Sequence, residues 1–320
     1  MNFNRFKKID DTSIKNRYEE AKSLKKLCDV LSKLKIKHWI NCGTLLGAYR
    51  EEKIIDHDND LDLTAIINFD DNWTCPLHGS KKYQINLLYE LQQDFYIKTF
   101  TENKYVALIP RDHSNFNLNQ IDIGWFPSEE SSYFQPFFLD ELDTIKLYDI
   151  EFPCPRHLDL YIPLRYGSDW KTPKENFSPV EMLTPFKKNW TCYTSLVGDL
   201  FHAGHYNLLK RCKKLFQKVI VGVHNDEQVM SYKEKPLDSY EVRLENVKKT
   251  GLFDDIYENA PAITTQSFID DLEVDFVVAG REPSEKIKQM YPVDINRLHL
   301  IERTPNISSS MLRKLKSGLF

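Results

Sequence analysis

Three aspartates occupy alternate positions in the segment HDNDLD, at Asp58, Asp60 and Asp62. Residues two apart on a β-strand project from the same face, so these carboxylates would crowd together on one surface. Like charges at such short range repel one another unless a divalent cation holds them. The pattern predicts an anchor for Mg²⁺ or Mn²⁺ in phosphoryl chemistry, and the alternative is an acidic surface without a ligand.

A calcium-binding EF-hand loop does not fit this segment. Such a loop needs glycine at its sixth position and glutamate at its twelfth. A loop that opens at Asp58 would place Leu63 and Phe69 at those positions, and a loop that opens at Asp56 fails at both of them too. The calcium alternative is therefore excluded.

A second group of chemically capable residues stands in DLFHAGHYNLLKRC, where His202 and His205 flank Ala203 and Gly204. The context predicts a strand before the motif and a helix directly after it. Free N–H groups at a helix N-terminus bind phosphate, and glycine lets a phosphate approach the backbone. The imidazoles would stabilise charge on an α-phosphate while one phosphate group displaces pyrophosphate. Taken singly, such histidines are more often surface residues or metal ligands.

The acidic segment needs a strand to position it, and the sequence around it predicts mixed α and β structure. Apolar residues at helical spacing predict one long helix over 11–35. The stretch KHWINCGTLLG predicts a strand that runs into a tight glycine turn, and β-rich stretches predict further strands at 61–69, 105–109 and 120–125.

The histidine motif needs parallel strands, and the second half of the chain predicts them. Strands at 193–197, 218–224, 275–280 and 298–301 alternate with helices at 204–216, 239–250 and 265–272. This alternation is typical of a Rossmann-like, doubly wound parallel sheet, in which ligands bind at the carboxyl ends of the strands. The Pro-rich polar stretch from about 170 predicts a linker, so we expect one domain over 1–185 and a different one over 190–320.

Residues 193–318 resemble the HxGH nucleotidyltransferases, and among them the cytidylyltransferases that make CDP-glycerol, CDP-choline and CDP-ethanolamine. The family's second signature is similar to the segment RTPNISSS. The resemblance implies contacts to the nucleotide and its phosphates from Asp199, Gly204, Arg303, Thr304, Ser308, Ser309 and Ser310, with Asp199 shaping the loop before the histidines.

A basic segment, YKEKPLDSYEVR, resembles the mobile lysine loop of the same family. The resemblance implies that Lys233, Lys235 and Arg243 contact the triphosphate, and the alternative is a solvated charged face. Many relatives carry an acidic pair after the fourth strand, whereas Arg281 and Glu282 stand there as substrate-binding candidates. Because a cationic phosphocholine would meet unfavourable charge beside Arg281, we expect a neutral or anionic alcohol such as glycerol phosphate.

The N-terminal half resembles the LicD family over residues 35–175. Two segments carry this resemblance, GTLLGAYREEKIIDHDNDLDL and CPRHLDLYIPLRYGSDWKTP. The family implies a polymerase-β-like, α+β nucleotidyltransferase fold that transfers a phospho-alcohol from a CDP-alcohol to an acceptor hydroxyl. It implies metal ligands at Asp58, Asp60, Asp62 and Asp122, a proton acceptor at Asp122, and phosphate contacts at Gly43, Thr44 and Arg50.

Composition places these motifs in an ordinary globular protein. The 320 residues are 41% hydrophobic with a net charge of −4, which argues against a general nucleic-acid binder. We expect no transmembrane segment, a cytoplasmic location and reduced thiols, because the six cysteines form no disulfide framework. The pairs Cys75/His78 and Cys154/His157 leave a zinc site open as a less favoured alternative. Resemblance to the cytidylyltransferases implies a homodimer.

The two resemblances reinforce each other, because one half would make a CDP-alcohol and the other would consume it. We predict a bifunctional enzyme that joins CTP to a phosphorylated alcohol and transfers the phospho-alcohol to a glycan or glycolipid acceptor in surface polysaccharide biosynthesis. Glycerol phosphate is favoured over phosphocholine, phosphoethanolamine and ribitol phosphate. One alternative is a lone cytidylyltransferase with a non-catalytic glycan-binding module, and another is adenylyl transfer.

Overall fold

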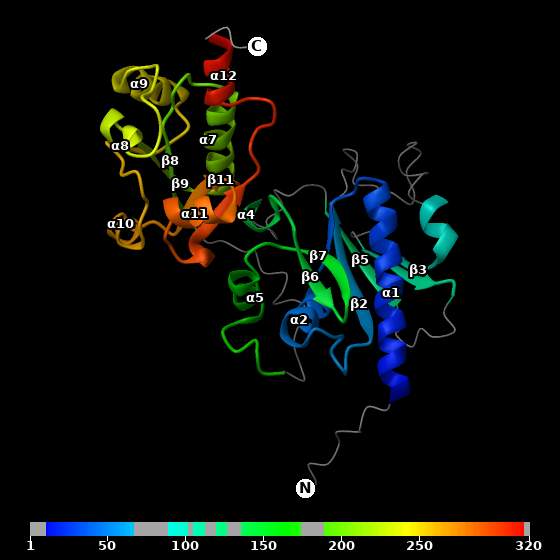
Figure 1. Ribbon diagram of the computed structural model, residues 1–320. Coiled ribbons are helices and arrows are strands. Elements are labelled where there is room, and N and C mark those ends of the chain that lie inside the picture. Colours follow the sequence, from blue (N-terminus) through cyan, green and yellow to red (C-terminus); the bar gives the residue numbers. More distant parts are fainter. Residues whose placement is uncertain are drawn as a thin grey trace. The chain divides into compact units, whose positions relative to one another are not determined.

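The computed structural model describes residues 11–66, 89–101, 105–112, 120–126, 136–173 and 189–316. The chain divides between Phe186 and Lys187 into two compact units, and each is described by itself (Figure 1). Residues 67–69 of one predicted strand, and the pair Cys75/His78, lie outside the described residues. In the described parts of the chain, no helix has the length and apolar character needed to cross a membrane.

The N-terminal unit is built on a mixed five-stranded sheet with the order β1-β2-β5-β4-β3. The strands are β1 (His38–Ile40), β2 (Asp60–Ile66), β3 (Phe95–Thr101), β4 (Tyr105–Pro110) and β5 (Gln120–Phe126). Only β2 and β5 run parallel, and their register sets Asp62 directly opposite Asp122. The predicted α+β character of this half is confirmed.

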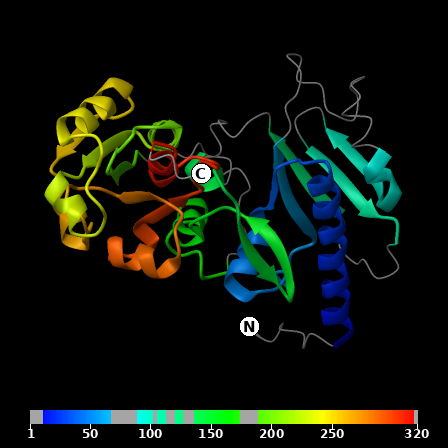
Figure 2. The same cartoon turned by 45° about the horizontal axis from the view of Figure 1, so that its top comes forward.

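Helices and a hairpin complete the N-terminal unit. These elements are α1 (Asp11–Lys33), α2 (Cys42–Glu51), α4 (Pro136–Leu139), α5 (Leu158–Tyr166), and the hairpin β6 (Asp143–Leu147) with β7 (Ile150–Cys154). Helix α1 runs alongside the sheet and contacts β1 and β7 (Figure 2). It does so through an apolar face at helical spacing, made by Ala21, Leu24, Leu27, Cys28 and Leu31.

Two local predictions for this unit are wrong. The expected glycine turn is the first turn of α2, because Cys42 adopts a left-handed conformation and the helix starts at once. Strand β2 starts at Asp60, so Asp58 precedes the strand and does not extend its face. Alternation alone could not locate this strand start, since the loop before β2 is fixed by contacts with α1.

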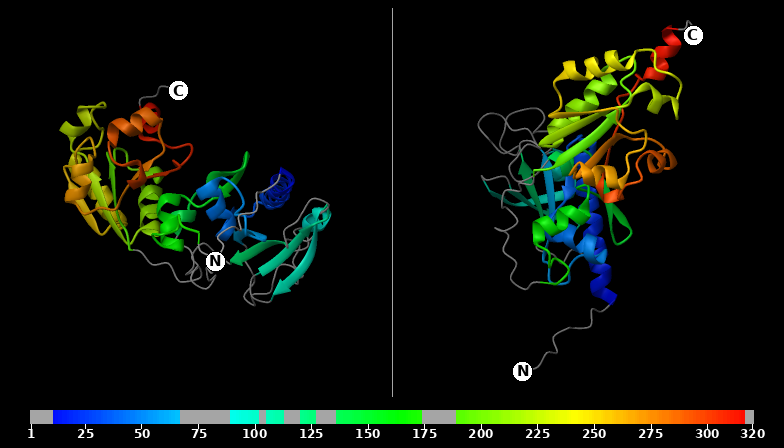
Figure 3. Two further views of the ribbon diagram at one scale, coloured as in Figure 1. Left: turned by 90° about the horizontal axis from the view of Figure 1, so that it is seen from below. Right: turned by 90° about the vertical axis from the view of Figure 1, so that its left-hand side faces the viewer.

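The C-terminal unit is a five-stranded, all-parallel sheet with the order β10-β9-β8-β11-β12 (Figure 3). The strands are β8 (Thr191–Leu196), β9 (Lys218–Val223), β10 (Asp255–Glu258), β11 (Phe276–Gly280) and β12 (Leu298–Ile301). The chain moves outward from β8 to β10 and then returns to start β11 on the other side of β8. The predicted doubly wound fold is confirmed, with its topological switch point between β8 and β11.

Helices cover both faces of this sheet. They are α7 (Ala203–Leu215), α8 (Asp226–Met230), α9 (Tyr240–Thr250), α10 (Gln266–Asp271), α11 (Ser284–Met290) and α12 (Ser309–Lys316), with a short 3₁₀ turn at Ile295–Arg297. On one face Tyr193 packs with Ile269 of α10 and Ile287 of α11. On the other face the neighbouring Cys192 meets Cys212 of α7. Successive residues of β8 thus serve opposite faces.

Gly222 of β9 provides a test of this packing. A Cβ atom there would lie 2.1 Å from Oη of Tyr193 and 2.9 Å from Cβ of Ala260, and the Tyr193 side chain is fully buried. We expect Gly222→Ala to lower the free energy of unfolding by about 1–3 kcal/mol through overpacking. Urea unfolding followed by circular dichroism measures this.

The matched control is Gly251→Asn at the end of α9. Gly251 has φ of +62° and no atom within 4 Å of an added Cβ, and asparagine tolerates that conformation. We expect a change of at most about 0.5 kcal/mol there. A Gly222→Ala chain as stable as wild type would refute the packing described for β8 and β9.

Candidate functional sites

A cavity of about 570 Å³ lies at the carboxyl ends of the parallel strands in the C-terminal unit. Its walls come from the residues that follow β8, β9, β11 and β12, together with the first turns of α7 and α12 and one side of α11. His202, Gly204 and His205 line it, as do Arg303, Thr304 and Ser308–Ser310. The two predicted motifs, 100 residues apart in the chain, therefore meet at the switch point.

The two histidines cap the helix that carries them. Nδ1 of His202 accepts a hydrogen bond from the amide of Gly204 at 3.0 Å, and Nδ1 of His205 accepts one from the amide of His202 at 3.3 Å. The rings stack with centroids 4.0 Å apart. Because an accepting Nδ1 carries no proton, each neutral ring holds its proton on Nε2.

Burial keeps both imidazoles neutral. It lowers the pKa of His205 to about 3, with a further contribution from His202, and it lowers the pKa of His202 together with Arg303. The pair therefore carries two neutral Nε2–H donors near pH 7 rather than two cations, and Nε2 of His202 lies 3.3 Å from Oγ of Ser309. Such donors stabilise charge that develops on a phosphate without adding a full positive charge.

Gly204 is also required by the helix cap. A Cβ atom at this position would lie 2.8 Å from Cε1 and 2.9 Å from Nδ1 of His202. Glycine is needed so that the His202 ring can fold back over the helix terminus. The capping hydrogen bond therefore requires glycine at position 204, in addition to any requirement from the approach of a ligand.

Asp199 organises the loops around the histidines. Its Oδ1 accepts the amides of Leu237 and Asp238 at 2.8 and 3.0 Å, and its Oδ2 accepts two hydrogen bonds from Arg313 of α12 at 3.0 and 2.7 Å. Burial alone would raise the pKa of Asp199, but the Asp238 amide and Arg313 outweigh it and lower that pKa. This matches the shaping role that the resemblance implies, and Asp199 itself does not line the cavity.

Several cationic side chains line the cavity. Lys233, Lys286 and Arg303 all line it, and Glu282 lies between two of them. Glu282 pairs with Arg303 at 2.5 Å and with Lys286 at 3.2 Å. Burial and the neighbouring Lys286 lower the pKa of Lys233. An anion entering this cavity would relieve the repulsion among these cations.

Three residues expected to contact substrate do not line the cavity. Arg243 is fully buried and donates to the carbonyl of His224 at 2.7 Å and to Asp226 at 2.6 Å, so it supports the loops and is not a triphosphate contact here. Lys235 uses its backbone carbonyl to bind Arg313, and Arg281 forms an ion pair with Glu302. Sequence position alone could not distinguish these roles.

Sequence reasoning missed other lining residues. Arg211 of α7, His224 after β9, and Lys286 and Tyr291 of the α11 segment all border the cavity. Arg211 was detectable, because it lies two helical turns beyond Gly204 and close to the same helix face. The residues of α11 were not, since that helix was not predicted.

In the N-terminal unit, acidic side chains gather on one face of the parallel pair β2 and β5. Leu61 and Leu63 are buried on the opposite face, so Asp60 and Asp62 share the other one. Asp122 lies opposite Asp62 in the neighbouring strand, and Nε2 of Gln120 donates to its Oδ2 at 3.1 Å. The structure thus brings together two acids that are 60 residues apart.

Helix α2 binds the same acidic strand. The amide of Gly43 donates to Oδ2 of Asp62 at 3.2 Å, and the amide of Asp62 donates to Oγ1 of Thr44 at 2.8 Å. Thr44 is fully buried. The Thr44 hydroxyl positions Asp62, and the phosphate contact expected from Thr44 stays a prediction.

Asp58 approaches the same point from the loop before β2. A Cβ atom on Gly43 would lie 2.3 Å from Oδ2 of Asp58, so only glycine leaves room for this carboxyl group. Arg17 of α1 holds the loop by donating to the carbonyl of Asp58 at 2.9 Å. Burial, and then the charge of Asp60, raise the pKa of Asp58 to about 7.

These carboxylates fit a divalent cation, but they supply only part of its ligands. Burial and then the charges of Asp60, Asp58 and Asp122 raise the pKa of Asp62 well above its ordinary value, and a bound cation would reverse that effect. Among the residues that the structure describes, no three His, Cys, Asp or Glu side chains are positioned as a metal site. Mg²⁺ commonly takes one or two carboxylates and completes its shell with water and substrate phosphates.

The second half of the predicted zinc pairing belongs to the protein core. Cys154 is fully buried, and His157 stacks on Phe137 with ring centroids 4.9 Å apart. Burial lowers the pKa of His157 to about 4. These contacts account for both residues without a metal.

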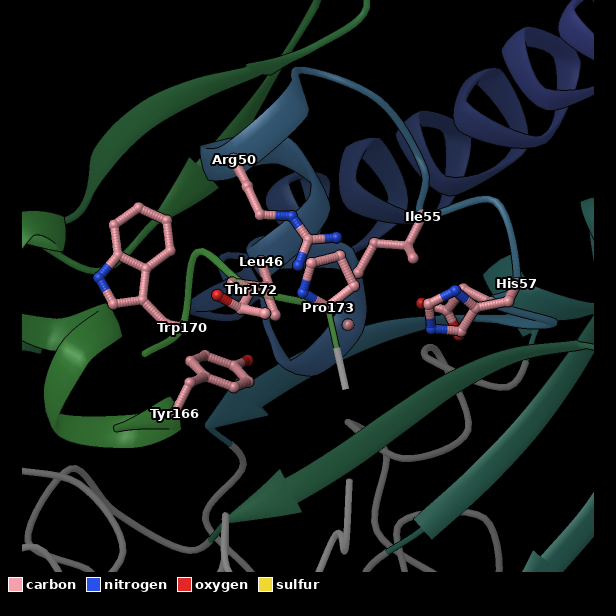
Figure 4. Close-up of a pocket in the computed structure, with 10 residues that line it drawn as sticks. Leu46, Arg50, Ile55, His57, Tyr166, Trp170, Thr172 and Pro173 are labelled. Atoms are coloured by element: carbon pink, nitrogen blue, oxygen red, sulfur yellow. The ribbon is translucent and has the colours of Figure 1, made fainter. Parts of the chain in front are cut away.

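A smaller cavity, of about 140 Å³, lies beside the acidic group. Gly43 and Asp58 line it, and Arg50 extends into it from α2 (Figure 4). The guanidinium group of Arg50 also pairs with Glu51 at 2.5 Å, which offsets part of the charge expected for a phosphate contact.

The neutral state of the histidines can be tested directly. We expect ¹⁵N NMR of histidine-labelled protein to show His205 neutral at pH 5, with its proton on Nε2, because burial lowers its pKa to about 3. The His202→Gln and His205→Gln variants assign the signals. The same chain in denaturant is the control and should titrate near pH 6.5. A His205 midpoint above pH 6 in the folded protein would contradict the capping geometry.

Comparison with known proteins agrees with both sites. Residues 35–157 match the LicD/FKTN/FKRP nucleotidyltransferase domain, and residues 199–315 match the cytidylyltransferase-like family. The ethanolamine-phosphate cytidylyltransferase of Dictyostelium discoideum is 30% identical over 138 residues, covering 40% of this chain and 37% of that protein. A probable choline-phosphate cytidylyltransferase of Schizosaccharomyces pombe is 32% identical over 126 residues, covering 38% and 35%.

The chain spans about a third of the length of these curated relatives. A lipopolysaccharide core biosynthesis protein from Thermoplasma volcanium aligns over 36% of this chain and 98% of its own, at 18% identity and a TM-score of 0.30, which is too low to add to the assignment. Both resemblances seen in the sequence are confirmed by the family matches. Residues 35–157 therefore form a LicD/FKTN/FKRP nucleotidyltransferase domain, and residues 199–315 form a cytidylyltransferase-like domain.

Proposed function

We propose that the C-terminal unit joins CTP to a phosphorylated alcohol, and that the N-terminal unit transfers the phospho-alcohol from the resulting CDP-alcohol to a glycan hydroxyl in surface polysaccharide biosynthesis. The observation that carries the proposal is the stacked pair of neutral imidazoles at the switch-point cavity. The acidic strand β2 with its neighbour Asp122 supports the second step.

In the first step a phosphate oxygen of the alcohol attacks the α-phosphorus of CTP. The new P–O bond forms as the bond to the β-phosphate breaks, and pyrophosphate leaves. His202 and His205 donate from Nε2 to the oxygens on which charge increases. The phosphate nucleophile is already anionic, so this step needs no general base from the protein.

The charges of the cavity favour an anionic phospho-alcohol. Arg281 does not account for this preference, because it pairs with Glu302 and does not line the cavity. Lys233 and Lys286 support the same preference, because both lining acids are already paired: Glu282 with Arg303 and Lys286, and Glu302 with Arg281. Glycerol phosphate is therefore favoured, and the ethanolamine- and choline-phosphate substrates named for the relatives form the second choice.

In the second step the acceptor hydroxyl attacks the phosphorus that carries the alcohol, and CMP leaves. Asp122 accepts the hydroxyl proton. Asp60 and Asp62 would hold Mg²⁺ or Mn²⁺, which would neutralise phosphate charge when bound. The Gly43 amide and the Thr44 hydroxyl keep Asp62 in place. A lone cytidylyltransferase with a glycan-binding N-terminal module is the alternative.

Matched variants in the two units separate these readings. We expect Asp60→Asn with Asp62→Asn to abolish CMP release from CDP-glycerol and acceptor, while pyrophosphate release from CTP and glycerol phosphate continues. His202→Ala should lower pyrophosphate release by about 10²–10³-fold and leave CMP release intact. Coupled phosphate and nucleotide assays measure both products. Unchanged CMP release in the aspartate variant would favour the binding-module alternative.

Substrate choice is tested by one screen of pyrophosphate release. With CTP, we expect kcat/KM for glycerol phosphate to exceed that for phosphocholine, phosphoethanolamine and ribitol phosphate, and ATP to be a poor replacement for CTP. Lys286→Ala should shift the ratio of glycerol phosphate to phosphocholine about fivefold toward phosphocholine, because Glu282 loses one of its cations. A ratio that does not change would remove Lys286 from substrate selection.

A further inference from the structure

The 140 Å³ cavity of the N-terminal unit is continuous with the acidic group. Gly43 lines the cavity, and its amide is bonded to Asp62. Asp58 also lines the cavity, and the nearby charge of Asp60 helps to raise the pKa of its carboxyl group. A ligand in this cavity would therefore lie next to the carboxylates that we assign to phosphoryl transfer.

The cavity walls are mainly apolar and partly aromatic. They are made by Leu46, Ile55, Tyr166, Trp170 and Pro173. In Figure 4 the rings of Tyr166 and Trp170 lie on one side and the side chains of Ile55 and His57 on the other.

The aromatic wall is held in place from behind. Tyr166 donates its hydroxyl to the carbonyl of Cys42 at 2.6 Å, so the ring contributes mainly apolar surface. Trp170 packs on Tyr49 with ring centroids 5.2 Å apart. A backbone hydrogen bond from Trp170 to Gly167 fixes the turn that carries the indole.

Four polar side chains complete the lining, and they differ in whether they donate or accept hydrogen bonds. Arg50 offers donors, Asp58 offers acceptors, and His57 and Thr172 can do both. Oδ2 of Asp58 is buried without a hydrogen-bond partner among the described residues. Groups that both donate and accept, as hydroxyls do, are the ones that satisfy such a lining.

Size and charge narrow the ligand further. A volume of 140 Å³ is below the range of about 300–1,000 Å³ that is typical of drug-sized ligands, so a whole nucleotide does not fit. The acid Asp58 disfavours an anion, and the cation Arg50 disfavours a cationic head group. A neutral carbon skeleton with several hydroxyls is left.

We propose that this cavity binds a sugar ring or a polyol, with its C–H groups against Trp170 and Tyr166 and its hydroxyls toward Arg50 and Asp58. The ligand has two sources in the proposed reaction, the alcohol of the CDP-alcohol and a sugar of the acceptor. The biological meaning rests on the proposed function, but the binding does not require turnover.

Saturation-transfer NMR tests the contact on the whole chain in the presence of Mg²⁺. The probes are CDP-glycerol, methyl β-galactoside and methyl α-glucoside. We expect saturation to reach the C–H protons of glycerol or of a glycoside, which identifies the source. Trp170→Ala should lower that saturation about fivefold or more, whereas Trp170→Phe should retain at least about half of it.

CDP-glycerol can also bind to the C-terminal unit, and it does so equally in both Trp170 variants. The difference in saturation between the two variants therefore reports the N-terminal cavity alone. Thermal unfolding shows whether each variant folds. Glycerol or glycoside saturation that is equal in wild type and Trp170→Ala overturns the proposal, as does the absence of saturation for all three probes. Selective loss of the cytosine signals would assign the cavity to the base and also overturn it. Failure of CMP release with intact sugar binding would reject the transfer reaction alone.

Discussion

The chemistry of the C-terminal unit depends on two hydrogen bonds at the start of α7. They occupy Nδ1 of His202 and of His205, which fixes the tautomer of both rings. The same bonds satisfy amides that a helix N-terminus leaves without partners. The helix cap and the proposed catalysis thus use the same two rings, and Gly204 is required because any side chain there would displace the His202 ring.

In the N-terminal unit a helix N-terminus also faces the candidate reactive side chains, but these side chains are acidic. Helix α2 begins directly after β1, and its first amides face the carboxylate of Asp62. A helix N-terminus stabilises one negative charge, but it cannot compensate several carboxylates at once. The remaining repulsion appears as the raised pKa values of Asp58 and Asp62. In both units a strand passes into a helix within two to seven residues, and that junction holds the reactive groups.

Sequence patterns predicted most of the C-terminal fold because β8, β9 and β11 are almost wholly buried, and β9 and β11 read as continuous apolar runs, whereas the mostly exposed β10 was not predicted. They also identified His202 and His205, whose spacing is local. They did not reveal the contacts of Arg243 with the His224 carbonyl and Asp226, or the contact of the Thr44 hydroxyl with a strand 18 residues away. The cavity with Trp170 was invisible for the same reason, because its walls come from α2, the loop before β2 and the turn after α5.

Asp199 and Arg313 connect the first loop of the C-terminal unit to its last helix. Ser309 strengthens this connection by donating to the carbonyl of Asp199 at 2.8 Å. These bonds join the two ends of the unit beside the cavity. Shortening the chain within α12 would remove Arg313 and break this connection. A helix at the edge of the domain therefore helps to shape its binding cavity.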